Sequence, residues 1–372
     1  MPRKRRPNYI PFITAVCFVV IVIAAIIFAI ISALNGGNTP ADPTPTTTTA
    51  PHSVQISATT AATTTKSTSA TTTKATTVAV TTTTKPPKTT ATSTSSTSDT
   101  KVAAYNNYIS KFALAPRSGF VVKSKADINK GLQILVNNDH AYDTTQSSDL
   151  INMMNVSNRS YFVAYTDLDA DRFTIQQFNY MNTAFLNKYS YKLQACSGYR
   201  SYESQKNKFD NSVANSGLEE TLKWYTRPGH SEHHTGFAID YNTNAFGSEK
   251  FDGKGDQAFI HQTCHNYGFI LRYTAEKKPI TGVNAEAWHF RQVGIPHATY
   301  IMKNNICLEE YIDKLYNYSY QNPLKVTDDD GHKYEIYYVK SAGESTDVPV
   351  TSGAQYTISG NNIDGFIVTV LK

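Results

Sequence analysis

A threonine-rich segment limits, more than any other feature, what this 372-residue chain can fold into. Between residues 41 and 100, 26 of the 60 residues are threonine, and most of the others are serine, alanine, proline or lysine. No aromatic residue occurs between Phe28 and Tyr105. Such a segment has too little apolar surface to offset the entropy lost when a backbone becomes ordered. Residues 35–104 are therefore predicted to be a disordered linker, and a hydrophobic core is expected only after them.

An uncharged run of 25 apolar or small residues, 10–34, precedes the linker. At ~1.5 Å per residue it would form a helix of roughly 37 Å, which is enough to cross a hydrocarbon layer of ~30 Å. A cleaved signal peptide is the alternative, but its apolar region usually spans about 7–15 residues. Four lysines and arginines in residues 1–9 favour a cytoplasmic N-terminus. The sequence thus predicts a single-pass membrane protein whose remaining chain lies outside the cell.

Charge and cysteine content restrict the function classes further. The net charge is +5, and part of it comes from the N-terminal basic cluster, so nothing indicates a nucleic-acid partner. Cys17 lies in the apolar run, which leaves three other cysteines without any CxxC pair: Cys196, Cys264 and Cys307. Buried free thiols are predicted, while one disulfide plus one free thiol remains open. The sequence gives no indication of the oligomeric state.

The globular part is divided into residues 105–320 and 321–372. In the first, apolar residues recur every three or four positions from Ile175 to Tyr189, which predicts an amphipathic helix. Several short strand-like segments follow, so we expect an α+β domain with a small antiparallel sheet flanked by helices. Residues 321–372 hold two alternating strand-like stretches and are predicted to be a small β-rich extension. It either packs on the main domain or forms a separate binding module.

Polar residues gather in the segment HSEHHTGFAID, residues 230–240. A catalytic zinc takes three nitrogen or oxygen ligands and keeps one open position. His233 and Asp240 can converge if the turn before the strand bends the chain, and His289 of EAWH can complete the set. Glu286 would then stand beside the metal as a general base. The residues alone leave the alternative open, because solvated loop histidines and strand-capping aspartates are common.

Four motifs together resemble the VanY-type zinc D-alanyl-D-alanine carboxypeptidases: SGYRSYESQ, RPGHSEHHTGFAID, YGFILRY and ITGVNAEAWHFRQVG. The resemblance covers roughly residues 131–314. It implies that family's hedgehog-like α+β fold and Zn²⁺ held by His233, Asp240 and His289. It also implies that Glu286 is the general base and acid, and that Arg200 steadies the oxyanion of the substrate.

The same resemblance implies substrate contacts, although a purely structural role remains the alternative for these residues. Ser231 binds substrate or only caps a turn, and Trp288 contacts substrate or packs beneath the site. Gln205, one helical turn after Arg200, is a further candidate for a substrate contact. His234 and His230 fall outside the expected ligand set.

The function implied by the family is removal of the C-terminal D-alanine from peptidoglycan stem peptides outside a bacterial cell. Two alternatives keep the same fold. One is an L,D-carboxypeptidase that acts on tetrapeptide stems, and the other is a catalytically inactive wall-binding protein. Glu286 favours an enzyme, because a protein without hydrolytic activity has no need of the base.

Overall fold

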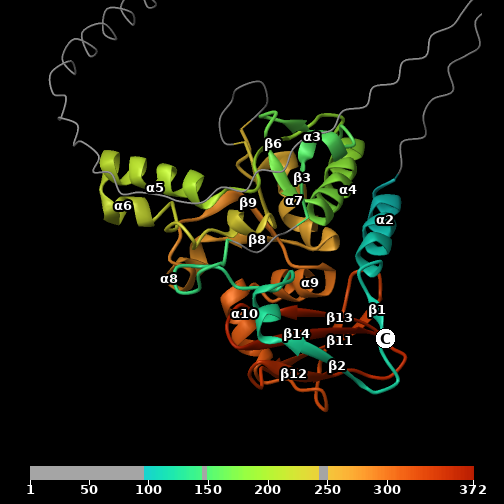
Figure 1. Cartoon of the computed structure of the whole chain (residues 1–372). Helices are drawn as coiled ribbons and strands as arrows, with labels where there is room; N and C mark the ends of the chain where they lie inside the picture. Colours follow the sequence, from blue (N-terminus) through green and yellow to red (C-terminus); the bar gives the residue numbers. More distant parts are fainter. Residues whose placement is uncertain (1–95, 145–148, 243–249) are drawn as a thin grey trace, which may run out of the picture. The chain divides into compact units, whose positions relative to one another are not determined.

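The computed structural model describes residues 96–144, 149–242 and 250–372 (Figure 1). Its first element is α2 (Thr97–Ile109), whose start is set by a capping box. Asp99 N–H donates to Ser96 Oγ at 3.1 Å, and Ser96 N–H donates to the Asp99 carboxylate at 2.8 Å. This helix begins inside the range predicted to be linker. The linker composition hides the boundary, because the capping serine is one of many serines and threonines.

The remaining N-terminal predictions lie outside the described residues. They are the basic residues 1–9, the apolar run 10–34 and the linker up to residue 95. Within the described part of the chain, no helix combines the length and apolarity needed to span a membrane.

The first sheet has five strands in the order β4-β6-β7-β9-β8. Every neighbouring pair is antiparallel, as predicted, except β4 and β6, which are parallel. The strand bounds are β4 (Phe162–Val163), β6 (Gln194–Ser197), β7 (Ala238–Tyr241), β8 (Phe269–Tyr273) and β9 (Glu286–Gln292).

Helix α4 (Arg172–Tyr189) packs against this sheet, as the helical periodicity predicts. Asp171 caps it by accepting a hydrogen bond from Thr174 N–H at 3.0 Å. Phe178 is fully buried among aromatic rings of the sheet, with its centroid 5.1 Å from that of Tyr241. Gln177 on the same helix donates to the Ala104 carbonyl of α2 at 2.9 Å, which joins the first helix to the core.

The second sheet joins the two ends of the domain. Its order is β1-β13-β14-β11-β10, and a separate pair is formed by β2 and β12. The predicted extension therefore does not stand apart, because β1 and β2 come from the start of the domain. The bounds are β1 (Ala113–Leu114), β2 (Phe120–Ser124), β10 (Leu324–Thr327), β11 (Lys333–Lys340), β12 (Ser345–Pro349), β13 (Gln355–Gly360) and β14 (Gly365–Leu371).

A shared core binds this second sheet to helices of the main domain. Helices α9 (Ile295–Lys303) and α10 (Leu308–Leu315) contribute buried Ile301 and Leu308. They meet Val326 of β10 and Ile367 of β14 in one apolar cluster. Burying a side chain of this kind contributes ~1.5–3 kcal/mol, so the extension and the helices stabilise each other.

The α5–α6 hairpin projects from the sheet that carries β6, β7 and β9 (Figure 1). Gly217 joins α5 (Tyr202–Ser216) to α6 (Leu218–Leu222) at φ +80° and ψ 163°, a combination open to little but glycine. The other short elements are β3 (Leu150–Asn152), β5 (Asp169–Asp171), α3 (Met153–Val156), α7 (Ala258–Thr263), α8 (Lys278–Thr281), η1 (Lys125–Asn129), η2 (Glu232–Thr235), η3 (Gly255–Gln257), η4 (Cys264–Tyr267) and η5 (Ala275–Lys277).

Cys264 and Cys307 are buried free thiols, as the sequence predicts, whereas Cys196 is half-buried. Burial raises the pKa of Cys264 and of Cys307 to about 12. Both thiols therefore stay protonated and unreactive at neutral pH.

Candidate metal centre

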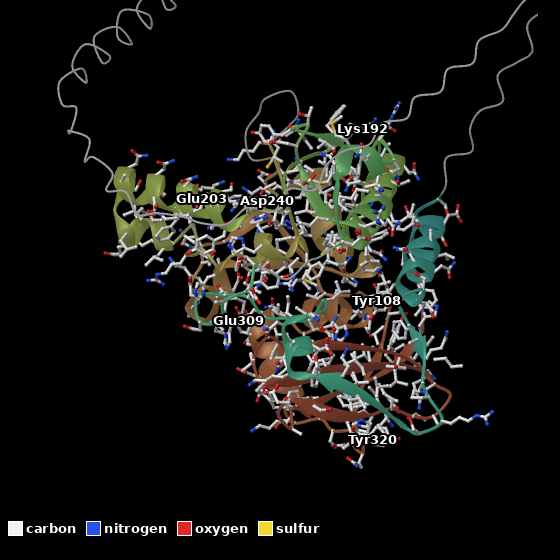
Figure 2. The ribbon with its side chains drawn as sticks, in the orientation of Figure 1. Tyr108, Lys192, Glu203, Asp240, Glu309 and Tyr320 are labelled. Carbon is white, nitrogen blue, oxygen red and sulfur yellow. The ribbon has the colours of Figure 1, made fainter. Side chains whose placement is uncertain are left out.

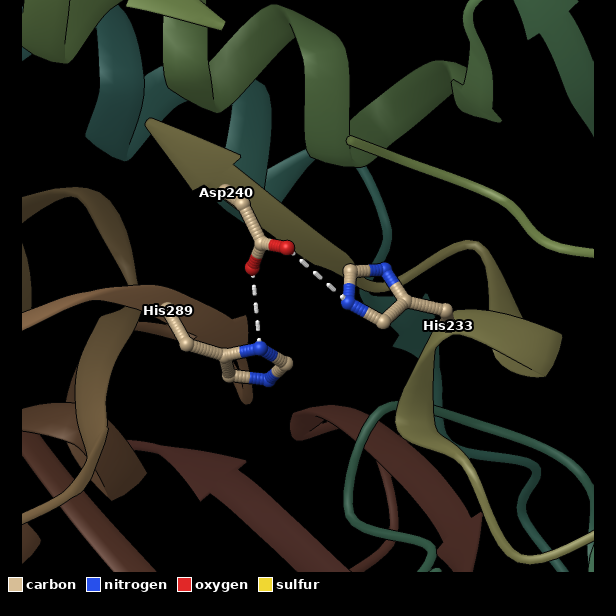
Figure 3. Close-up of side chains that lie close together, drawn as sticks. All are labelled: His233, Asp240 and His289. Atoms are coloured by element: carbon tan, nitrogen blue, oxygen red, sulfur yellow. Dashed lines mark ion pairs between the residues drawn. The ribbon is translucent and has the colours of Figure 1, made fainter. Parts of the chain in front are cut away.

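Three side chains from separate elements meet at the centre of the first sheet: His233 of η2, Asp240 of β7 and His289 of β9 (Figure 3). Asp240 and His289 are directly paired across the antiparallel strands, so their side chains leave the same face of the sheet. The structure thus brings together the three ligands that the sequence analysis selected.

The local sequence explains how His233 reaches Asp240. Ser231 caps η2 by accepting from His233 N–H at 3.3 Å, and Gly236 ends it in the left-handed region at φ +74°. A Cβ at Gly236 would lie 2.7 Å from Leu150 Cδ2, so the turn needs glycine for space as well as for conformation. Strand β7 then begins at once and carries Asp240 back beside His233.

The ligand atoms converge on a small volume. His233 Nε2 lies 3.3 Å from Asp240 Oδ2, and His289 Nδ1 lies 2.9 Å from Asp240 Oδ1. One donor atom from each residue lies within 4.8 Å of the other two. Figure 3 shows the carboxylate between the two imidazoles, each facing it with one nitrogen.

Hydrogen bonds on the far side of each ring decide which nitrogen faces the centre. His233 Nδ1–H donates to the Gly198 carbonyl at 2.6 Å, which leaves the Nε2 lone pair free. His289 uses the opposite nitrogen: Nε2 lies 3.2 Å from Glu232 Oε2, so Nδ1 faces Asp240. Such outer partners fix the tautomer and orientation of metal-binding histidines.

These residues fit a divalent cation. Asp240 Oδ1 is buried and finds no partner of hydrogen-bond geometry among the described residues, although His289 Nδ1 is close. Burial lowers the pKa of His233 to about 4, so its imidazole is neutral, as a ligand must be. Two imidazoles and one carboxylate leave open positions, which is typical of a catalytic site.

Glu286 stands beside the triad and outside the set of ligands. It begins β9, is 8% exposed, and its Oε2 lies 3.7 Å from His289 Nδ1. Burial raises the pKa of Glu286 to about 7, although His289 and Arg200 oppose the rise. A carboxyl with a pKa near neutrality can both accept and return a proton.

Arg200 is held rigidly at the edge of the centre. Its guanidinium donates to Gln205 Oε1 at 2.7 Å and to Ser197 Oγ at 2.9 Å. Gln205 is buried on α5 and donates in turn to the Thr226 carbonyl at 2.7 Å. Gln205 therefore orients Arg200, a role that the sequence did not indicate.

The remaining sequence candidates have mixed placements. Ser231 and Trp288 both line the cleft. Each also has a structural role, because Ser231 caps η2 and Trp288 packs against the core. His234 is buried and turned away from the triad: it donates to the Arg200 carbonyl at 2.7 Å and accepts from Gly229 N–H at 3.0 Å. His230 Nδ1 contacts the Asn137 carbonyl at 2.7 Å, also outside the triad.

Glu232 is a residue beside the candidate ligands that the sequence analysis did not select. Besides His289, it accepts from Arg272 Nε and from Arg291 Nη1, each at 2.8 Å, and its side chain is fully buried. Arg272 also makes a bidentate pair with Glu309, at 2.7 and 2.9 Å. Burial would raise the pKa of Glu232, but the two arginines hold it well below its usual range. A signal did exist, because both arginines stand inside apolar strand sequences, FILRY and HFRQV.

The metal centre lies in a cleft of about 830 Å³. Figure 2 labels Asp240 at the centre and Glu203 on α5, the helix whose inner face forms one wall. Aromatic side chains line much of the rest: Tyr165, Tyr199, Trp224, Tyr225, Tyr273 and Trp288. A cleft of this volume accepts a short peptide.

Comparison with known proteins agrees with the site. Residues 170–295, which contain all the residues of the centre, match the family model described as VanY, D-alanyl-D-alanine carboxypeptidase. A D-alanyl-D-alanine carboxypeptidase of Enterococcus faecium is 37% identical over 175 residues, or 47% of this chain and 52% of that protein. The bifunctional D-Ala-D-Ala dipeptidase and D-Ala-D-Ala carboxypeptidase VanXYC of Enterococcus gallinarum is 39% identical over 124 residues, or 32% of this chain and 65% of that protein.

A solved structure extends the similarity to the fold. The vancomycin resistance D,D-dipeptidase VanXYg, in complex with a D-Ala-D-Ala phosphinate analog, matches with a TM-score of 0.62 at 30% identity. The match covers 68% of this chain and 98% of that one, whereas the chain spans about half the length of the Enterococcus faecium relative. Sequence, fold and metal centre agree: the chain belongs to the VanY family of D-alanyl-D-alanine carboxypeptidases.

Proposed function

We propose that this protein is a zinc-dependent carboxypeptidase that removes the C-terminal D-alanine from peptidoglycan stem peptides. The observation that carries the proposal is the buried triad with Glu286 and Arg200 beside it in one cleft. Membership of the VanY family supplies the substrate class. His233, Asp240 and His289 would hold the zinc. When bound, the ion would polarise the scissile carbonyl and lower the pKa of the attacking water.

The protein's own groups account for the proton transfers and for the developing charge. Glu286 takes the proton of the attacking water and returns it to the leaving amine of D-alanine. The Arg200 guanidinium, fixed by Gln205 and Ser197, donates to the oxyanion that forms on the substrate carbonyl. A preorganised donor of this kind contributes about 10²–10³-fold in kcat.

The test is hydrolysis of matched synthetic stem peptides by the purified chain, with products identified by mass. We expect release of one D-alanine from a pentapeptide ending in D-Ala-D-Ala. Glu286→Gln should keep its zinc and lose activity by about 10²–10⁴-fold. A Glu286→Gln protein that released D-alanine at the wild-type rate would refute the mechanism. Cleavage of the tetrapeptide alone would instead establish the L,D-carboxypeptidase alternative.

We further propose that residues 10–34 anchor the chain in the cell membrane with the N-terminus inside, so that the catalytic domain faces the wall. The length of the apolar run and the basic residues before it support this topology. Protease added to cells stripped of their wall should then remove the domain. If the domain were protected until the membrane is lysed, this topology would be wrong.

A further inference from the structure

One face of α5 forms a wall of the cleft. Ser204, Lys208, Ser212 and Ser216 follow one another at intervals of four residues, and all four line it. Residues four apart on a helix lie on the same side, so this wall extends along most of the helix. Among the described residues that line the cleft, Arg200 and Lys208 are the ones that carry a permanent positive charge.

The two cations are not equivalent. Arg200 is committed to Gln205 and Ser197, which hold its guanidinium in place. Lys208 is exposed and forms no ion pair with any described residue; its Nζ lies 5.5 Å from the centroid of the Tyr225 ring. By contrast, Lys206 on the same helix pairs with Asp210 and does not line the cleft. Lys208 is thus a cation in a substrate cleft without an anionic partner.

Lys208 lines the same cleft as Arg200, Asp240 and Glu286. Partial burial lowers its pKa, Arg200 lowers it further, and Asp240 and Glu286 raise it. Helix α5 begins two residues after Arg200, so Lys208 lies on the half of this wall nearer to Arg200, and Ser216 lies at its far end. In a carboxypeptidase substrate, the terminal carboxylate lies one residue beyond the scissile carbonyl, or about 3.5 Å along the chain. A cation that binds this carboxylate must lie beside the metal centre.

We propose that Lys208 binds a carboxylate of the substrate, with the C-terminal carboxylate of the leaving residue as the group that its position favours. The inference rests on the proposed function, because it assigns a specificity residue to that reaction. It explains how the cleft distinguishes a chain end from an internal peptide bond. An ammonium stabilises a carboxylate through a charge-assisted hydrogen bond.

The first experiment compares two peptides that differ only at the chain end, one ending in D-alanine and the other in D-alaninamide. The wild-type protein should prefer the acid in kcat/KM. Lys208→Met should lower kcat/KM for the acid by about 10- to 100-fold and leave the amide unchanged. Lys208→Arg should restore most of the preference, and Lys206→Met is the matched control expected to behave like wild type. Equal losses on both peptides, or no loss on either, would overturn the proposal.

A second pair of peptides identifies which carboxylate is bound. Both end in D-alanine, and an internal glutamate is present in one and replaced by glutamine in the other. If Lys208→Met loses discrimination only in this pair, the bound group is the internal carboxylate and the C-terminal assignment is overturned. If it loses discrimination only between acid and amide ends, the C-terminal assignment is supported.

A binding measurement separates this inference from the proposed function. Calorimetry with the same acid and amide peptides on Glu286→Gln requires no turnover. We expect tighter binding of the acid, and loss of that difference in the Glu286→Gln, Lys208→Met double variant. If this Lys208-dependent acid preference is found while the wild-type protein hydrolyses neither peptide, the proposed activity is refuted and the carboxylate site is retained. An acid preference that survives Lys208→Met would refute the site.

Discussion

Replacing Glu232 by glutamine is expected to weaken the fold and the metal centre together. The carboxylate accepts from Arg272 and Arg291 through Oε1 and meets His289 Nε2 through Oε2. A glutamine has one acceptor and one donor end. With its oxygen toward the arginines, its NH₂ group faces His289 Nε2 and forces the ring proton onto Nδ1, the nitrogen that faces the metal centre. With the opposite orientation, the NH₂ group opposes two guanidinium groups.

The size of both effects follows from these contacts. Removing one partner from a buried ion pair usually costs about 3–5 kcal/mol, and the lower end applies because Arg272 keeps Glu309. A loss of about 3 kcal/mol is a large part of the ~5–15 kcal/mol that holds a domain folded. Loss of an outer-shell partner typically lowers metal affinity by about 10–100-fold, and a wrong tautomer places Glu232→Gln at the upper end.

Urea unfolding and zinc titration against a competing chelator measure the two effects separately. Glu309→Gln is the matched control, because it removes a charge from the same arginine and does not touch His289. It should lower the free energy of unfolding and leave zinc affinity near wild type. If Glu232→Gln and Glu309→Gln had the same zinc affinity, Glu232 would not set the orientation of His289.

Three further predictions concern the metal ligands, acid stability and the second sheet. Metal analysis should show that His233→Ala loses zinc and that His234→Ala retains it. His234→Ala should instead lower the free energy of unfolding by about 1–3 kcal/mol, because Gly229 N–H and the Arg200 carbonyl lose a buried partner. The reverse pattern would mean that the wrong histidine was assigned. Burial acts to raise the pKa of Glu309, but Arg272 holds this pKa below its usual 4.5. The ion pair therefore stabilises the fold above pH 4.5, and its contribution is lost as the pH falls below that value. In urea unfolding, the free energy of unfolding of Glu309→Gln should fall less steeply with acid than that of the wild type, and parallel curves would contradict this. A chain ending at residue 320 should not unfold cooperatively by circular dichroism, because it exposes the apolar faces of α9 and α10, and a sharp transition would show that the extension is dispensable.

Much of the site was predictable because motifs of the sequence resemble those of a known family, whereas the residues alone left a metal site open. His233, Asp240, Glu286 and His289 occur in two motifs, and the β7–β9 register that joins the motifs follows from two adjacent antiparallel strands. Glu232 escaped prediction because its importance depends on Arg272, which is distant in sequence. A buried charge network cannot be inferred from one member, since burial is decided by the whole fold.

The fold was predictable where contacts are local and not where they are distant. The apolar periodicity from Ile175 to Tyr189 predicted α4, because a helix is formed by residues three or four apart. The position of the C-terminal strands stayed open, because β1 pairs through Ala113 with Tyr356, at the other end of the domain. An alternating pattern shows that a strand exists and does not identify its partner.

The strand order of the second sheet also determines when this sheet can form during synthesis. Strand β14 lies between β11 and β13, yet the ribosome makes it after both of them and after β1. The middle of the sheet is therefore missing until Leu371 has been made, and the apolar cluster around α9 and α10 lacks Ile367 until then. A nascent chain in this state is prone to aggregation and to proteolysis. Strand β14 completes the middle of the sheet.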